Sequence, residues 1–353
     1  MPNQPFAIAG RAIGPGQPPY VVAEISANHG QDYQQAEALI RAAAAAGADA
    51  VKLQTYTADT LTLDCDRPPF RIEGTIWNGR TLYDLYGEGS MPWDWQPKLR
   101  DVAHAHGMTL FSSPFDATAV DFLESIGIAA YKIASFEIVD LPLLRRVAAT
   151  AKPVILSTGM ATLEEIDEAL RTLRQAGAGP IALLKCTSAY PAGADEMNLH
   201  GLSRLAEIFA VPVGLSDHTR EVAVPVAAVA LGAAIIEKHL TLSRTLGGPD
   251  CEFSLEPDEF QQMAAAVRTA YRALGSTSFG AGPSETASRR LRRSLFAVRD
   301  IRAGHRFTVE NERSIRPADG LHPRYLDRVL QATARTDIPR GTPLALEHLA
   351  ENL

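Results

Sequence analysis

Two histidines at the ends of apolar segments could bind a metal ion. His218 lies in "VGLSDHT" and His239 lies in "IIEKHL", 21 residues further along (239 minus 218), which is the length of one strand–helix unit. A single histidine at a strand end is more often structural. Two on neighbouring strand ends, with Asp217, Asp250 and Glu24 as nearby carboxylates, favour a metal site that leaves positions open for water and a substrate oxygen.

The two segments belong to a series of eight short, β-rich apolar runs that alternate with helical patterns. The runs cover residues 20–26, 49–55, 108–113, 129–135, 153–158, 181–187, 211–217 and 234–240. Near-continuous apolar strands alternating with helices indicate a parallel sheet covered on both faces, and eight units predict an α/β fold of the (β/α)8 TIM-barrel type. An open doubly wound sheet is the alternative, but "AEISANHG" lacks the glycine-rich turn of that fold.

All eight runs end in polar residues, and the carboxyl ends of the strands carry the active site in this barrel class. These residues are Glu24, Lys52, Gln54, Ser112, Ser113, Lys132, Ser135, Ser157, Lys185, Thr187, Ser216, Asp217, His218, Glu237, Lys238 and His239. For one lysine or serine, a solvated strand end is the ordinary explanation. Lysines on four runs, together with several hydroxyls, favour a phosphate or carboxylate ligand.

Changes in composition divide the chain into parts. We expect a catalytic barrel over residues 1–275, a Gly/Ser/Thr-rich linker over 276–288 and a small, mostly β domain over 289–353. One long connection, residues 56–94, contains Asn78-Gly79 between β-type residues. This dipeptide predicts a type I′ hairpin at the mouth of the barrel.

Composition restricts location and partners. The 353 residues carry a net charge of −7 with acids and bases interspersed, which argues against nucleic-acid binding. The basic "RRLRRS" at 289–294 fits a solvated surface. Three scattered cysteines indicate reduced thiols, and no segment resembles a signal peptide or a membrane span. We therefore expect a cytoplasmic protein without a membrane partner.

Several motifs resemble the sialic acid synthase family, whose members condense phosphoenolpyruvate with an amino-sugar aldehyde. The motifs include "AEISANH", "GADAVKLQTY", "YKIASFE", "LLKCTSAYP", "PVGLSDHT", "IIEKHLTL" and "GGPDCEFSLEPDEF". The tail motif "SIRPADGLHP" resembles the antifreeze-like (SAF) domain of that family. "WNGRTLYDLY", "MPWDW" and "SSPFDATAVDFLE" are most similar to the pseudaminic acid synthase branch, whose sugar substrate is 2,4-diacetamido-2,4,6-trideoxy-L-altrose.

The resemblance implies roles for individual residues. His218 and His239 would hold a divalent metal, Mn2+ or alternatively Mg2+ or Co2+, and would form the catalytic set with Glu24 and Asp250. The residues implied to bind phosphoenolpyruvate are Lys52, Ser113, Lys132, Ser135, Ser157, Lys185, Ser188 and Ser216. Those implied to face the sugar are Gln54, Tyr190, Phe253 and Arg316. Arg316 would come from the partner subunit of a domain-swapped homodimer.

This chain departs from the family pattern at a few positions, and other functions remain open. Ser188 stands where sialic acid synthases have asparagine, Lys185 where they often have histidine, and Cys251 where sialic and legionaminic acid synthases tend to have histidine. N-acetylneuraminate or legionaminate synthesis is the nearest alternative. A synthase acting on phosphorylated sugars would need more basic residues. A sugar-binding or ice-binding module would not need the ring of polar strand ends.

Overall fold

The computed structural model describes residues 4–276 and 279–350, which form two compact units. The first unit is Met1–Gly275 and the second is Ser276–Leu353. Within the expected linker, residues 277–278 lie outside the described ranges, as do residues 1–3 and 351–353 at the ends of the expected domains.

The first unit is a closed barrel of eight parallel strands in the order β10-β3-β4-β5-β6-β7-β8-β9, which confirms the predicted fold. Its strands are β3 (Tyr20–Glu24), β4 (Ala50–Thr55), β5 (Thr109–Pro114), β6 (Tyr131–Ile133), β7 (Val154–Ser157), β8 (Ile181–Cys186), β9 (Val213–Asp217) and β10 (Ile235–His239). Each predicted apolar run except 108–113 contains its strand entirely, and in that run the strand extends one residue further. The barrel closes where β10 pairs with β3, which places His239 opposite Glu24.

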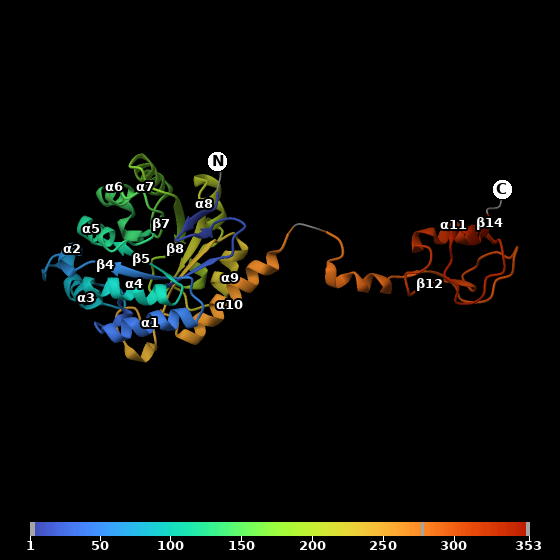
Figure 1. Ribbon diagram of the computed structural model, residues 1–353, viewed down its shortest axis with the longest axis horizontal. Coiled ribbons are helices and arrows are strands. Elements are labelled where there is room, and N and C mark those ends of the chain that lie inside the picture. The colour runs from blue at the N-terminus through green and yellow to red at the C-terminus, as the bar shows by residue number, and fades with distance from the viewer. Residues whose placement is uncertain (1–3, 277–278, 351–353) are drawn as a thin grey trace. The chain divides into compact units, whose positions relative to one another are not determined.

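Helices surround the strands (Figure 1). They are α1 (Tyr33–Ala45), α4 (Gln96–Ala105), α5 (Ala117–Ser125), α6 (Leu141–Ala148), α7 (Leu163–Gln175), α8 (Gly201–Phe209), α9 (Ala223–Ala230) and α10 (Pro257–Leu274). Local sequence sets their ends. The Thr162 and Glu165 side chains form a capping box at the start of α7, and Gly47 with φ +84° follows α1. Their apolar faces are buried against the outside of the barrel.

A hairpin that sequence analysis did not predict closes the amino-terminal end of the barrel. Strands β1 (Phe6–Ile8) and β2 (Arg11–Ile13) pair antiparallel. Ile8 and Ile13 are fully buried and pack in one cluster with Tyr20 at the start of β3. The amino-terminal end is therefore filled with apolar side chains, and the polar strand ends lie at the other end of the barrel.

The insertion over residues 56–94 combines short helices with irregular segments, and it does not contain the predicted type I′ turn at Asn78-Gly79. It contains α2 (Ala58–Leu61) and α3 (Leu82–Gly89), and its β pairing is a single antiparallel bridge between Arg71 and Thr81. A type I′ turn requires positive φ at both central residues, and Asn78 is not among the residues with positive φ. Instead, the side chain of Asn78 accepts a hydrogen bond from the Gly74 N–H at 3.0 Å and closes a wider turn.

The second unit has its own small core. Strand β11 (Ser294–Ala297) pairs antiparallel with β12 (Glu312–Ile315), and β13 (Thr333–Ala334) pairs with β14 (Leu349–Ala350). One short helix, α11 (Leu326–Gln331), contributes Val329 to the apolar cluster between them.

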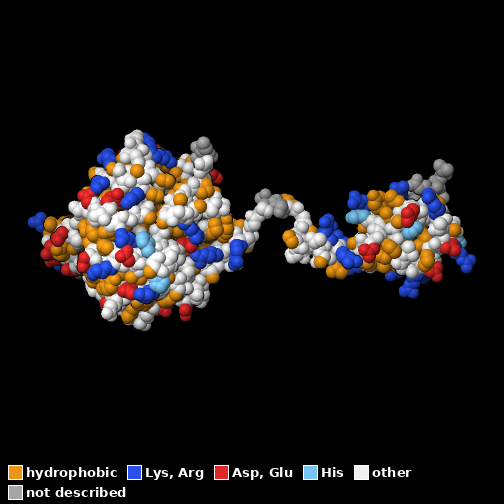
Figure 2. Space-filling view, viewed as in Figure 1, with side chains coloured by type: hydrophobic (Ala, Val, Ile, Leu, Met, Phe, Trp, Pro, Cys, Tyr) orange, Lys and Arg blue, Asp and Glu red, His pale blue; other side chains and the backbone are white. Residues whose placement is uncertain are grey.

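Charged side chains of both signs are interspersed over the face of the barrel unit that Figure 2 displays. Within residues 4–276 and 279–350, no helix is long and apolar enough to cross a membrane.

Candidate active site

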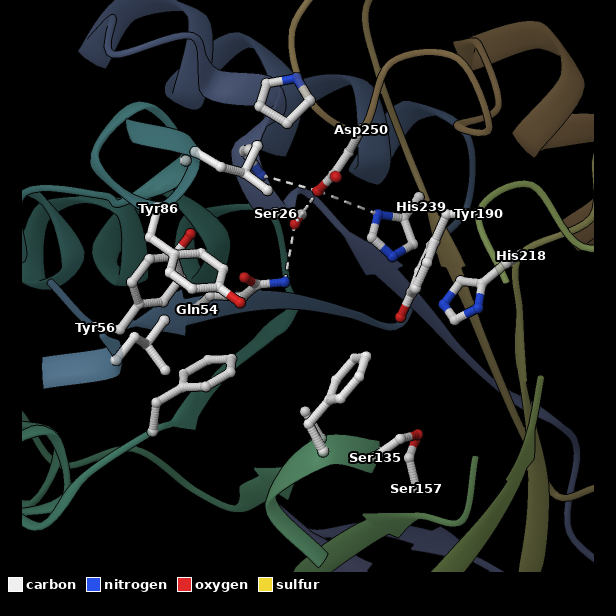
Figure 3. Close-up of a pocket in the computed structure, with 18 of the residues that line it drawn as sticks. Ser26, Gln54, Tyr56, Tyr86, Ser135, Ser157, Tyr190, His218, His239 and Asp250 are labelled. Atoms are coloured by element: carbon white, nitrogen blue, oxygen red, sulfur yellow. Dashed lines mark hydrogen bonds and ion pairs between the residues drawn. The ribbon is translucent and has the colours of Figure 1, made fainter. Parts of the chain in front are cut away.

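A cavity of about 470 Å3 lies at the carboxyl ends of the barrel strands (Figure 3). Its floor consists of polar side chains from the strand ends and from one adjoining loop: Lys52, Gln54, Lys132, Ser135, Ser157, Ser216, His218, Glu237, His239 and Asp250. Its wall is mostly apolar and aromatic and comes largely from the insertion: Leu61, Ile72, Trp77, Leu82, Leu85, Tyr86, Phe115 and Phe136.

Two lysines on the floor share two buried carboxylates. Lys52 Nζ lies 2.7 Å from Glu24 Oε2 and 2.6 Å from Glu237 Oε1, and Lys132 Nζ lies 3.6 Å from the same Glu237 oxygen. Burial would raise the pKa of Glu237, but Lys132 and Lys52 together outweigh it and hold the pKa at about 2. Glu237 is therefore ionised, whereas burial, only partly offset by the charge of Glu237, lowers the pKa of Lys52 to about 8.

The other two lysines of the strand ends point away from the cavity, because side chains alternate along a strand. Lys238 pairs with Asp217 at 2.6 Å, and both side chains are completely buried outside the barrel. Lys185 Nζ donates to the Cys186 carbonyl at 3.0 Å, and its stem lies beside Gly201 of α8. Lys185 is not among the residues that line the cavity, and its implied phosphate contact stays a prediction.

Three of the five implied serine ligands line the cavity. Ser216 Oγ donates to Glu237 Oε1 at 3.2 Å, Ser135 Oγ accepts from the Gly159 N–H at 3.1 Å, and the buried Ser157 Oγ has no hydrogen-bond partner. An unpaired buried hydroxyl is costly, which favours a ligand at this position.

The other two serines lie just outside the cavity. Ser113 is buried on β5 opposite Gln54, and its hydroxyl has no partner. Ser188 Oγ lies 3.8 Å from Cys186 Sγ, which does line the cavity. Neither serine is among the lining residues, so their implied contacts would need a shift of the surrounding side chains.

The two histidines are neighbours on the floor. Their ring centroids are 5.4 Å apart, and His218 Nδ1 lies 2.8 Å from the Thr187 carbonyl. This hydrogen bond assigns the proton to Nδ1 and leaves Nε2 as the ligand atom. Burial, followed by the charge of His218, lowers the pKa of His239 well below its usual value, and the buried His239 Nδ1 has no hydrogen-bond partner.

These two imidazoles could serve as ligands of a divalent ion. His239 is neutral and unpaired, whereas His218, whose pKa is raised because its hydrogen bond with Cys186 outweighs burial, would exchange that hydrogen bond and its proton for the metal. Among residues 4–276 and 279–350, no group of three His, Cys, Asp or Glu side chains is placed to hold a metal ion. An ion held by this pair would take its remaining ligands from water and substrate, which is the open arrangement expected from the sequence.

A chain of hydrogen bonds links three elements beside the histidines. Gln54 Nε2 donates to Ser26 Oγ at 2.8 Å, and Ser26 Oγ donates to Asp250 Oδ2 (Figure 3). Asp250 Oδ2 lies 4.0 Å from His239 Nδ1, and burial raises the pKa of Asp250. Glu24 does not line the cavity. Its carboxylate accepts the Ser26 N–H at 2.8 Å and pairs with Lys52.

Aromatic contacts connect the wall to the floor. Trp77 Nε1 donates to the Pro249 carbonyl at 2.9 Å, and the Trp77 ring lies 5.8 Å from that of Tyr190. Tyr190 lines the cavity, with its ring centroid 4.4 Å from that of His218. Phe253, which was implied to face the sugar, is buried behind the floor instead, 4.9 Å from His239 between ring centroids.

Sequence reasoning placed Glu237 among the polar strand ends without giving it a role, and it did not select Cys186 or Ser26, although all three line the cavity. Strand alternation could have found Glu237, which lies two residues before His239 on the same face. Burial would raise the pKa of the Cys186 thiol, but its hydrogen bond with His218 and the charge of that ring lower it to about 6. Arg316 lies in the second unit, and its role stays a prediction.

Comparisons with known proteins agree with this geometry. The NeuB family model matches residues 39–279, and the SAF domain model matches residues 292–350. A pseudaminic acid synthase from Helicobacter pylori is 42% identical over 96% of this chain and 99% of its own length. An N,N'-diacetyllegionaminic acid synthase from Legionella pneumophila is 34% identical, with 94% of both chains covered.

A solved structure has the same architecture. The N-acetylneuraminic acid synthetase from Leptospira borgpetersenii, crystallised with citrate, superposes with a TM-score of 0.73 at 30% identity, covering 82% of this chain and 96% of that one. The family model covers more than half of the sequence, and the barrel carries the expected polar strand ends. The chain therefore belongs to the NeuB family, the sialic acid synthase family that its motifs resemble.

Proposed function

We propose that this protein is a metal-dependent pseudaminic acid synthase. It condenses phosphoenolpyruvate with 2,4-diacetamido-2,4,6-trideoxy-L-altrose, consumes one water molecule, and releases pseudaminic acid and phosphate. The observation that carries the proposal is the 42% identity to a pseudaminic acid synthase along almost the whole chain, against 34% and 38% to two legionaminic acid synthases. The cavity supports it with a cationic floor and an apolar wall.

The lysine side of the floor suits phosphoenolpyruvate. Lys52 and Lys132 are two buried cations, and Ser135, Ser157 and Ser216 add hydroxyls around them. Charge-assisted hydrogen bonds from such groups bind phosphate and carboxylate strongly. The unpaired Ser157 hydroxyl would gain a partner when the ligand binds.

The histidine side of the floor suits the aldehyde. A divalent ion held by His218 and His239 would supply Lewis-acid polarisation of the sugar's carbonyl oxygen. Asp250 lies beside His239 and lines the cavity, so it is placed to hold a proton or a sugar hydroxyl. Glu24 orients Lys52 and the Ser26 backbone from behind the floor, and we assign it a positioning role.

The wall suits the apolar parts of the sugar. The proposed substrate has a methyl group at C6 and two acetyl methyls, whereas N-acetylmannosamine has hydroxyls at C4 and C6. Leu61, Ile72, Leu82 and Leu85 offer these methyls apolar contacts. A hydroxyl placed against such side chains would lose hydrogen bonds to water, which disfavours the more hydroxylated sugar.

Finer points stay predictions. We expect Mn2+ as the metal, a homodimer in which Arg316 of one subunit faces the sugar of the other, and a cytoplasmic location. Their support is the membership of the NeuB family and the match to the SAF domain model.

The test is phosphate release from phosphoenolpyruvate with Mn2+, run in parallel with the altrose derivative, with N-acetylmannosamine and with the legionaminate precursor. Release only with the altrose derivative, abolished by a chelator, is the expected result. Release only with another sugar would keep the reaction and overturn the substrate. No release with any sugar would contradict the synthase function and favour a sugar-binding module.

A further inference from the structure

Ser26 has an unusual backbone for its residue type. It begins the short 3-10 helix η1 (Ser26–His29) directly after β3, and its φ is +39°. Side chains with a Cβ are disfavoured in this left-handed region, where glycine is the usual residue. Ser26 is also buried, at 4% exposure, and lines the cavity. Left-handed residues other than glycine at such positions commonly have a functional reason.

The side chain and backbone of Ser26 reach three parts of the site. Its N–H donates to Glu24 on β3 at 2.8 Å, its hydroxyl oxygen accepts from Gln54 Nε2 on β4 at 2.8 Å, and its hydroxyl proton goes to Asp250 (Figure 3). A hydroxyl has a single proton. The Ser26 hydroxyl oxygen accepts from Gln54, and its proton is donated to Asp250. The donor and acceptor of each hydrogen bond in this series are therefore fixed.

We propose that Ser26 is a positioning residue that holds Gln54 and Asp250 in one arrangement for the amino sugar. The inference rests on the proposed function and deepens it. It states that one hydroxyl orients both Gln54, on β4, and Asp250, on the loop after β10. Without the Ser26 hydroxyl, Gln54 and Asp250 have no shared partner and can turn independently. The phosphoenolpyruvate side is linked to Ser26 through the backbone, because Glu24 accepts the Ser26 N–H and pairs with Lys52, whereas the Ser26 hydroxyl bonds Gln54 and Asp250.

Two substitutions separate the hydroxyl from the backbone. Ser26→Gly removes the hydroxyl and suits the positive φ, whereas Ser26→Ala removes the hydroxyl and keeps the backbone strain. We expect Ser26→Gly to melt at or above the wild-type temperature and Ser26→Ala to melt below it. Because a hydrogen bond to a charged group is lost, both variants should lose turnover roughly 10- to 100-fold and should have a higher KM for the sugar. The KM for phosphoenolpyruvate should stay within about twofold of the wild-type value.

Ala210→Gly is the matched control. Ala210 also has a positive φ, +53°, but it follows α8 and precedes β9, away from the carboxyl ends of the strands. The control should gain stability without a change in turnover. A further variant, Ser26→Gly in a Gln54→Ala background, should cost much less than Ser26→Gly alone, because the partner being positioned is already absent.

The outcomes are distinct. Wild-type kcat and sugar KM in Ser26→Gly would overturn the inference and leave the proposed function intact. A loss in Ser26→Ala that Ser26→Gly restores would show that only the backbone matters, which also overturns it. An equal rise in the KM for both substrates would contradict selective positioning. A wild-type protein that releases no phosphate with any of the three sugars would overturn the proposed function and this inference with it.

Discussion

The floor and the wall of the cavity obtain their side chains in different ways. The floor stands mainly on the strands of a closed barrel, where the hydrogen-bonded register sets the height of each residue. The wall stands largely on the insertion over residues 56–94, which has two short helices and a single β-bridge. The floor is charged and fully packed, whereas the wall is apolar and tied to the rest of the unit by contacts such as Trp77 to Pro249.

This difference suggests that the floor carries out the reaction and that the wall selects the sugar. Groups that meet phosphate and aldehyde must be held rigidly, since small displacements are costly for catalysis. Groups that meet the variable part of a sugar can stand on a loop, where substitution disturbs the barrel least. We therefore expect floor variants to lose the reaction and wall variants to change the choice of sugar.

The largest effect should come from the histidine pair. His218→Ala should lower phosphate release roughly 1000-fold or more, because metal polarisation supplies several kcal/mol of transition-state stabilisation. The measurement is phosphate release with Mn2+, alongside thermal melting to show that the barrel still folds. His104→Ala, at an exposed position on α4, is the control and should retain full activity. Near-wild-type rates in His218→Ala would contradict the metal site.

The two orientations of the strand-end lysines give the next test. Lys132→Ala should raise the KM for phosphoenolpyruvate roughly 10- to 100-fold, because a buried cation of the floor is lost. Lys185→Ala should leave that KM within about twofold, because its amine binds a backbone carbonyl away from the cavity. Steady-state kinetics with the sugar saturating measures both. Equal effects in the two variants would show that the floor extends further than the cavity indicates.

A smaller effect is expected from the wall. Leu85→Ala should raise the KM for the altrose derivative roughly tenfold while the KM for phosphoenolpyruvate stays constant, since lost apolar contact weakens binding of the methyl groups. Leu63→Ala, on the same insertion but 60% exposed and outside the cavity, is the matched control. A rise in the KM for phosphoenolpyruvate in Leu85→Ala would contradict the separation of floor from wall.

The last prediction concerns the stability of the fold and its pH dependence at Glu137, which lines the cavity. Burial raises the pKa of Glu137 to about 7, above the ordinary value of 4.5. The folded state therefore binds the proton more tightly than the unfolded chain, and the carboxyl costs stability as pH rises from about 4.5 through 7. Glu137→Gln should be more stable than wild type by about 3 kcal/mol at pH 8, and nearly equal to it near pH 4.5.

Melting temperatures of both proteins at the two pH values measure this change. The exposed Glu164→Gln should show no such dependence on pH. A constant difference between Glu137→Gln and wild type at all pH values would show that Glu137 is not desolvated in the folded protein.

The barrel could be predicted because the strands and helices of an α/β unit have different hydrophobic periods. The floor could be predicted only in part, since a polar strand end does not show which side faces the cavity. Lys132 and Lys185 look alike in sequence, and only the register and closure of the barrel separate them. In the insertion, Asn78-Gly79 predicts a two-residue hairpin turn, but the Asn78 side chain accepts a hydrogen bond from the backbone N–H of Gly74 and closes a wider turn instead. Ser26 was missed because no sequence rule assigns a positive φ to serine.

Glu237 has a consequence for which ligands the cavity accepts. Its carboxylate lies 2.6 Å from Lys52 and 3.6 Å from Lys132 before any ligand arrives. Glu237 competes with any anionic ligand for the two lysines. An incoming anion must weaken the ion pairs that Lys52 and Lys132 already make with this carboxylate. An anion with a single negative charge would merely exchange one ion pair for another. A phosphorylated carboxylic acid brings enough charge to engage both lysines while Glu237 remains, so we expect the cavity to bind it in preference to small monovalent anions.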